Sequence, residues 1–136
     1  MCMAEQHFRE VNSDFRPHSD WQEDYFHTIQ SNPQFRLCWI VADDEKVGFI
    51  LYGTEKHRFL PRTTGTLYEL YVKPEHRRRG YAKECALLAI EELNANRPSK
   101  IQLEITCGSR AAEALWTSLG FQKVSERMVL RPEKSK

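Results

Sequence analysis

The feature that most constrains this chain is a strand-like segment, a basic turn and a helix that follow one another between Leu67 and Leu93. Strand-forming residues run from Leu67 to Val72, and the turn behind them contains three consecutive arginines and Gly80. The first N–H groups of a helix lack intrahelical partners and lie at its positive dipole end, so they attract anions. A glycine lets such a backbone approach a pyrophosphate closely. The turn therefore predicts a site for a phosphate-bearing cofactor.

Length and charge limit the other possibilities. A chain of 136 residues predicts one domain, residues 1–136, in which 132–136 form a disordered tail. Its formal net charge of +1 gives no general field that would attract nucleic acid or an anionic membrane. Residues 1–10 are polar and no window is apolar enough to span a bilayer. We therefore expect a soluble, cytoplasmic protein that binds neither nucleic acid nor membrane.

The cysteines are widely scattered and contain no Cys-x-x-Cys pair: Cys2, Cys38, Cys85 and Cys107. This spacing argues against a zinc site and against a compact disulfide framework. We expect four reduced thiols and no metal. Cys107 has an alternative interpretation as an acyl-accepting nucleophile, but no activating His or Asp is identifiable near it, so a packed thiol is expected.

The first half of the chain predicts a strand, a helix and a hairpin. Phe8 and Val11 suggest a short first strand. Within residues 20–30 the large apolar side chains recur at helical spacing, and an Asn-Pro pair ends that helix. Residues 36–42 and 47–52 are apolar runs joined by a polar turn, which is typical of an antiparallel hairpin.

The second half continues this alternation. A basic loop at 55–65 leads into the strand that ends at Val72, and a helix is predicted from about residue 79 to residue 94. One face of that helix is apolar and lines the core: Ala82, Cys85, Ala86, Ala89, Ile90 and Leu93. Polar residues lie on the opposite face: Lys83, Glu84, Glu91 and Glu92.

The end of the chain predicts two further strands and a helix between them. Residues 100–106 alternate apolar and polar side chains, as a strand with one wet face does. Ser109 is placed to cap the next helix, which Gly120 ends. Residues 124–131 predict a terminal strand, or two with a break near Ser125. The element order describes a mixed α/β sheet.

Two motifs resemble the GNAT superfamily of acyl-CoA-dependent N-acyltransferases. Arg77, Gly80 and Ala82 match its signature Gln/Arg-x-x-Gly-x-Gly/Ala, and Leu115–Phe121 resembles its fourth-helix ending Leu-Tyr-x-x-x-Gly-Phe. The resemblance covers residues 36–131. It implies an α/β fold with a mixed, mostly antiparallel central sheet, splayed at strands 4 and 5 and flanked by helices. Strand 4 would be the strand that ends at Val72.

The resemblance also implies which residues bind acetyl-CoA. In relatives the turn amides hold the pyrophosphate, and the strand before the turn pairs its backbone with pantetheine and directs an amide at the thioester oxygen. The positions that match these roles are Leu70, Tyr71, Val72, Arg77, Arg78, Arg79, Gly80, Tyr81, Ala82 and Lys83. Position 78 is often Gly in relatives. Ser109 stands where relatives often carry an Asn that binds pantetheine.

For catalysis the candidates are Glu69 and Tyr68. Amine acylation needs a deprotonated nitrogen, and Glu69 is the one acid in this strand. A solvent-facing or salt-bridged Glu is the alternative. Tyr68 is a rival contact, and period-two alternation places it on the opposite face from Glu69 unless a bulge intervenes. The histidines offer little: His7, His18 and His27 lie in the divergent N-terminal part, His57 in a loop and His76 beside the turn.

Two departures from the family pattern bear on function. Relatives usually carry a Tyr that protonates the departing thiolate, and Trp116 stands in its place. An indole N–H donates a hydrogen bond but releases no proton in this pH range, so Trp116 is expected to bind the cofactor by packing beside the CoA sulfur. A core aromatic on the helix face is the alternative. Relatives also place two helices between their first two strands, whereas residues 12–35 leave room for one helix and a long loop. The acceptor side is then open or completed by another subunit.

Direct transfer of acetyl from acetyl-CoA to a primary amine of a small molecule or peptide is the function these features favour. A CoA-binding sensor or interaction module without turnover is the alternative that Trp116 suggests. Nucleic-acid binding through Arg77–Arg79 would show a steep salt dependence. Basic residues in the predicted loop suit a carboxylate-bearing acceptor: Lys56, His57, Arg58 and Arg62. Acidic residues near the first predicted helix suit a polyamine: Asp14, Asp20, Glu23 and Asp24. The alternative for both groups is solvated surface charge. Relatives are often dimers, so a homodimer is an expectation.

Overall fold

The computed structural model describes residues 3–11, 20–105 and 109–132. The chain divides into two compact units, Met1–Thr106 and Cys107–Lys136.

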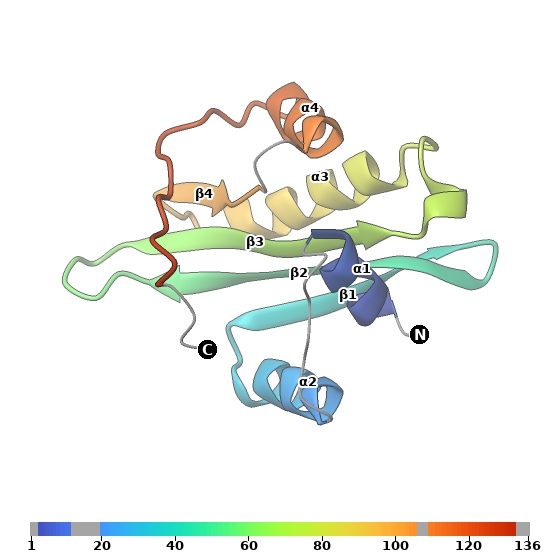
Figure 1. Cartoon of the computed structure of the whole chain (residues 1–136). Helices are drawn as coiled ribbons and strands as arrows, with labels where there is room; N and C mark the ends of the chain where they lie inside the picture. Colours follow the sequence, from blue (N-terminus) through green and yellow to red (C-terminus); the bar gives the residue numbers. More distant parts are fainter. Residues whose placement is uncertain (1–2, 12–19, 106–108, 133–136) are drawn as a thin grey trace. The chain divides into compact units, whose positions relative to one another are not determined.

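The first unit is built on a four-stranded sheet (Figure 1). Its strands are β1 (Phe35–Ala42), β2 (Glu45–Lys56), β3 (Thr63–Val72) and β4 (Lys100–Leu103), in the spatial order β1-β2-β3-β4. β1, β2 and β3 pair antiparallel, and β4 pairs parallel to β3. The predicted mixed sheet is confirmed. Residue 106, the expected end of the last of these strands, lies outside the described residues.

Helices cover both faces of this sheet (Figure 1). α1 (Met3–Val11) and α2 (Trp21–Ser31) pack on one face, where Phe49 and Tyr71 form a core cluster with residues of both helices. After the short 3-10 helix η1 (Pro74–His76), α3 (Tyr81–Asn94) packs on the other face against Val47 and Val72. Because side chains alternate along a strand, β3 contributes to both layers.

The predicted hairpin and the predicted helix at about residues 79–94 are confirmed. β1 and β2 are joined by Asp43 and Asp44, both at positive φ (52° and 62°), which is the backbone of a tight two-residue hairpin turn. The central position of β2 explains its long buried run. α3 buries Ala86, Ala89 and Leu93, as its apolar face predicts.

The N-terminal prediction is wrong. Phe8 and Val11 belong to helix α1 and not to a strand. Ala4 and His7 are buried and Phe8 packs against the aromatic rings of α2, so the inward residues follow a helical spacing. The chain therefore places two helices before β1. Residues 12–35 contain one described helix, α2, as expected for that stretch, and residues 12–19 lie outside the described residues.

The second unit contains α4 (Arg110–Ser118). Gly120, at φ +98°, follows the helix as the predicted terminating glycine. Ser109 occupies the N-cap position, but its side chain makes no capping hydrogen bond, so that prediction is wrong. The predicted strand at 124–131 is also wrong, because the described segment is irregular and pairs with no strand. Strand-forming residues need a neighbouring strand to bond.

Candidate active site

A β-bulge lies at the centre of the candidate site. Leu51 of β2 pairs with Glu69 of β3, but the next residue, Tyr52, pairs with Leu67. Tyr68 is therefore an extra residue that the partner strand does not match. In a regular strand Tyr68 and Glu69 would point to opposite faces. The bulge is the exception under which the predicted alternation fails, so the two side chains share one face.

Both side chains point to the same face of the sheet. Glu69 pairs with Leu51, and the hydroxyl of Tyr68 donates a hydrogen bond to the carboxylate of Glu55. Positions 51 and 55 of β2 point to the same face by period-two alternation. That face is the one α1 covers, because His7 of α1 contacts Glu69 directly. The structure thus brings the two catalytic candidates together.

Glu69 is bound by a histidine that the sequence did not single out. Nε2 of His7 hydrogen-bonds Oε2 of Glu69, and the pair joins residues 62 positions apart in the chain. His7 is only 7% exposed, whereas the Glu69 side chain keeps 27% of its surface accessible. The carboxyl group is therefore held on one side and open to solvent on the other.

Tyr68 is fixed as a hydrogen-bond donor. Its ring packs edge-on against Phe35, with the ring centres 5.1 Å apart. Burial, and then the hydrogen bond to Glu55, raise the pKa of the Tyr68 hydroxyl far above its usual value. The group therefore stays protonated at neutral pH. It suits acceptor binding better than proton abstraction.

Arg77 joins the basic turn to β3 and α1. Its Nε donates to the carbonyl of Val72 at 2.7 Å, and its Nη2 donates to both carboxylate oxygens of Glu10 at 2.8 Å. The guanidinium also lies over the ring of Tyr71, 5.3 Å from its centre. Burial and the charge of Glu10 raise the pKa of Tyr71, and Arg77 opposes that rise. The side chain of Arg77 thus holds the turn in place.

The turn itself has an unusual backbone. Arg78 and Gly80 both adopt positive φ, 65° and 83°, a region that favours glycine. A Cβ built on Gly80 meets nothing within 4 Å, so the space in front of the helix is open. Gly80 is the N-cap of α3, and no side chain caps the amides that follow. Tyr81, Ala82 and Lys83 therefore begin the helix with N–H groups that an anion can bind.

The strand before the turn has one edge that β4 pairs with only in part. β4 bonds to β3 from Thr64 to Leu67, and the pairing in the described residues goes no further. Leu70 and Val72 direct their side chains into the α3 layer, as expected for core residues. The side chains of Leu70 and Val72 are thus part of the core, and the Tyr71 side chain points to the α1 side.

The family follows from the whole sequence. The model of the acetyltransferase (GNAT) family matches residues 4–121. The chain belongs to the GNAT acetyltransferase family. That family uses acetyl-CoA, and the match runs through both compact units. No curated protein matches the sequence.

Solved structures share the GNAT fold at low identity. A ribosomal-protein-alanine N-acetyltransferase from Brucella melitensis superposes with TM-score 0.72 at 16% identity, over 95% of this chain and 88% of that one. An aminoglycoside acetyltransferase from an uncultured soil sample gives TM-score 0.70 at 14% identity, over 97% and 86%. A transcriptional regulator from Bacillus halodurans gives 0.72 at 18% identity, over 80% and 73%. These likenesses show the fold alone.

Two GNAT site predictions fall in the second unit. Trp116 is buried and packs edge-on against Phe121, with ring centres 5.5 Å apart. Its spacing on α4 is that of a core aromatic. Ser109 makes no side-chain capping bond and is half-buried.

The described residues of this GNAT chain include possible metal ligands and two cysteines. No group of three or more His, Cys, Asp or Glu side chains in them is placed to hold a metal ion. Cys38 and Cys85 are free thiols, while Cys2 and Cys107 lie outside the described residues. None of the described helices is long and apolar enough to cross a bilayer.

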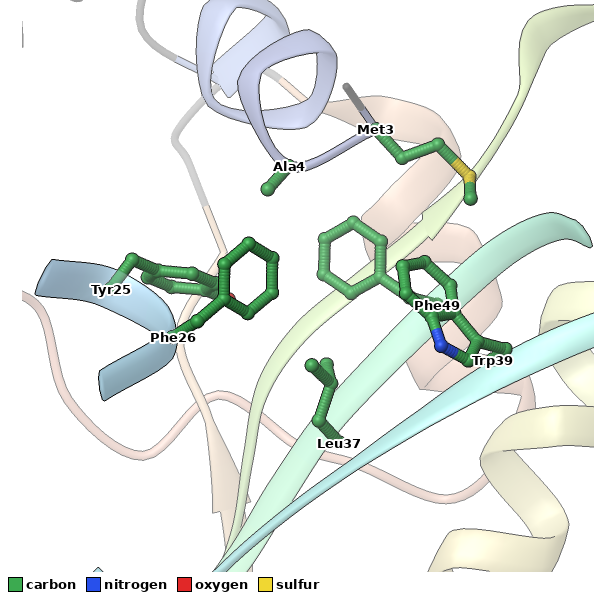
Figure 2. A pocket seen from close by; sticks show the side chains of 7 residues that line it. All are labelled: Met3, Ala4, Tyr25, Phe26, Leu37, Trp39 and Phe49. Carbon is green, nitrogen blue, oxygen red and sulfur yellow. The ribbon is translucent and has the colours of Figure 1, made fainter. Parts of the chain in front are cut away.

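A small cavity on the α1 and α2 side is apolar (Figure 2). It measures about 30 Å³, and Figure 2 shows side chains from both helices and from β1 and β2 around it. Its lining residues are Met3, Ala4, Tyr25, Phe26, Leu37, Trp39 and Phe49. It is too small for a cofactor or acceptor and is a gap in the packing.

Proposed function

We propose that this chain is an N-acetyltransferase that transfers acetyl from acetyl-CoA directly to a primary amine. The single observation that carries the proposal is that Glu69 lies on the α1 face of β3, bonded to His7, on the strand that leads through the basic turn to the N-terminus of α3. The candidate base thus lies on β3, and the candidate phosphate site lies in the turn that follows β3. Membership of the GNAT family supports the choice of acyl donor.

The turn residues fit the pyrophosphate of CoA. The amides from Arg78 to Lys83 would bind it, and the open space at Gly80 leaves room for the phosphate oxygens. Arg79 is exposed and adds a charge-assisted contact. Arg77 would support the turn indirectly, because its guanidinium already binds Glu10 and the carbonyl of Val72.

The backbone of Leu70–Val72 would bind the pantetheine arm and the thioester. Pairing between β3 and β4 ends at Leu67, and we propose that the two strands diverge from there, as the fourth and fifth strands of relatives do. The free strand edge then offers carbonyl and N–H groups to the arm. An N–H directed at the thioester oxygen stabilises the oxyanion that develops during attack.

Glu69 would act as the general base. An acceptor ammonium gives one proton to the carboxylate, directly or through water, and the nitrogen lone pair then attacks the thioester carbon. The C–S bond breaks with its electron pair on sulfur, the new amide nitrogen loses its second proton to solvent, and solvent protonates the thiolate. A thiol with an unperturbed pKa of about 8.5 is a good leaving group, so Trp116 need not supply a proton.

The acceptor class is a primary amine of a small molecule or peptide. Among the structural neighbours, one is named for an aminoglycoside and another for the alanine of a ribosomal protein. Because the fold serves both, the acceptor is found by measuring thiol release from acetyl-CoA with aminoglycosides, polyamines, amino acids and peptide N-termini. Turnover with any of these supports the proposal.

A CoA-binding module without turnover is the second candidate, and Trp116 at the position of the usual proton donor favours it. The same screen separates the two. Tight CoA binding with no thiol release for any amine would establish the module, and the absence of CoA binding would overturn both. We further propose that the two units form one acetyltransferase domain, because the family match runs through both.

A further inference from the structure

Helix α1 contacts the candidate base and the basic turn through three polar side chains. Gln6 accepts a hydrogen bond from the Tyr71 hydroxyl at 3.3 Å, His7 bonds Glu69, and Glu10 binds Arg77. Residues 6, 7 and 10 lie on one side of a helix. This helix therefore reaches both halves of the proposed site.

The imidazole of His7 is enclosed by aromatic rings. The ring centres of Phe8, Phe49 and Tyr71 lie 5.5, 5.7 and 5.6 Å from that of His7, the last two edge-on. With 7% of its surface exposed, the side chain has little room to change rotamer. Its Nε2 is thus fixed in direction toward Oε2 of Glu69.

We propose that His7 is a positioning residue for Glu69: its Nε2–H holds Oε2 so that Oε1 faces the acceptor amine. The inference rests on the proposed function. Both the neutral tautomer protonated on Nε2 and the imidazolium offer this donor. Among the described residues no other hydrogen bond to this carboxyl is recorded, so one oxygen is held and the other is left for the proton.

Simple anchoring of α1 does not account for a histidine here. The contacts of Gln6 with Tyr71 and of Glu10 with Arg77 already attach α1 to the sheet and the turn. An apolar ring at position 7 would fill the aromatic enclosure without burying a polar group. The polar atom Nε2 of His7 is therefore explained by its hydrogen bond to the Glu69 carboxylate. A general base gains from being held, since a misplacement of about 1 Å can cost about a hundredfold in rate.

The test compares His7→Phe, His7→Gln and the neighbouring variant Gln6→Leu in the thiol-release assay. Phe fills the enclosure but has no donor, so kcat should fall by about 10- to 100-fold while KM for acetyl-CoA stays unchanged. Gln restores an N–H donor and should recover most of that loss. Gln6→Leu removes a comparable α1–β3 hydrogen bond and should leave kcat close to that of the parent.

The outcomes separate the inference from the function beneath it. If the parent chain turns over and His7→Phe does so equally well, only the positioning role is overturned. Equal losses in all three variants would show general loosening of α1 and overturn it too. A parent chain without turnover overturns both proposals. Independently of turnover, the ¹⁵N resonance of His7 Nε2 should shift in Glu69→Gln and not in Gln6→Leu, and an unshifted resonance contradicts the pair.

Discussion

The two faces of the sheet are packed with different types of side chain. The α3 face is packed mainly with small and aliphatic side chains, among them Val47, Val72, Ala86 and Ala89, together with buried Tyr52, whose hydroxyl donates a hydrogen bond to Glu92. Burial there raises the pKa of the Cys85 thiol to about 11, and Cys38 and Glu84 add to the rise. The α1 and α2 face is packed with aromatic rings, and polar contacts run from α1 to the strand and the turn.

This difference separates two tasks. On the regular α3 face, the helix packs closely on the sheet. Its N-terminus, at Gly80, follows β3 through η1 and the basic turn. The aromatic face holds polar groups at fixed positions around Glu69. Damage to the first should remove cofactor binding, and damage to the second should remove chemistry while binding persists.

The largest effect is expected at Gly80. Gly80→Val places a β-branched side chain in the open space and at φ +83°, so CoA binding should fall below detection in calorimetry. The matched control is Gly120→Val, because Gly120 has φ +98° and the same open surroundings. Backbone strain should be similar in both variants, but only the first should lose CoA. Equal affinity in the two would mean that the cradle is misplaced.

The next largest effect is expected at Glu69. Glu69→Gln should lower turnover by about a hundredfold or more at neutral pH, and by much less at high pH where the amine deprotonates itself. The control is Glu55→Gln, which changes the other carboxylate on this face. An equal loss at every pH would point to a structural role, and Tyr68→Phe would then test the rival residue.

A moderate effect on stability is expected at Arg77, which joins the basic turn to β3 and α1. Arg77→Met keeps the stem but removes the hydrogen bonds to Val72 and Glu10, which should cost about 1–2 kcal/mol in the free energy of unfolding by urea. Glu10→Gln keeps the carbonyl oxygen and removes only the exposed ion pair, so its cost should stay below about 1 kcal/mol. A Met variant as stable as the parent contradicts the role.

A smaller effect of opposite sign is expected at Arg78. Glycine tolerates φ +65°, so Arg78→Gly should raise the free energy of unfolding by about 0.5 kcal/mol, the net of relieved strain and added flexibility of the unfolded chain. Arg79→Gly is the control, since Arg79 is not among the residues at positive φ, and it should lower stability by a similar amount. Urea titrations without CoA distinguish the two signs.

The smallest effect on turnover is expected at Trp116. Trp116→Phe should keep most of the activity, because the proposed role of the indole is packing, and thermal melting will show whether the smaller ring loosens α4. A loss of more than about a hundredfold at unchanged CoA affinity would indicate a role in proton transfer.

The sequence predicted what local pattern determines. The apolar runs on either side of Asp43 and Asp44 specify a hairpin, and the spacing of Ala86, Ala89 and Leu93 specifies a helix face. The basic turn was also recognisable, because Gly80 and its neighbours lie within one short segment. These features need no information about distant residues.

What the sequence did not predict depends on contacts between distant segments. The bulge at Tyr68 is defined by register with β2, and the bond between His7 and Glu69 spans 62 positions. The helical spacing of Ala4, His7 and Phe8 was the one available signal for α1. At residues 124–131 the local pattern was misleading: strand-forming side chains there remain exposed, because the described segment has no strand to pair with.

The division between the two faces is tested most directly by titrating CoA into Glu69→Gln and measuring its turnover on the same preparation. The account predicts a CoA dissociation constant equal to that of the parent, together with a loss of about a hundredfold in turnover at neutral pH. A loss of CoA affinity that parallels the loss of turnover would contradict it, because Glu69 would then belong to cofactor binding or to the fold.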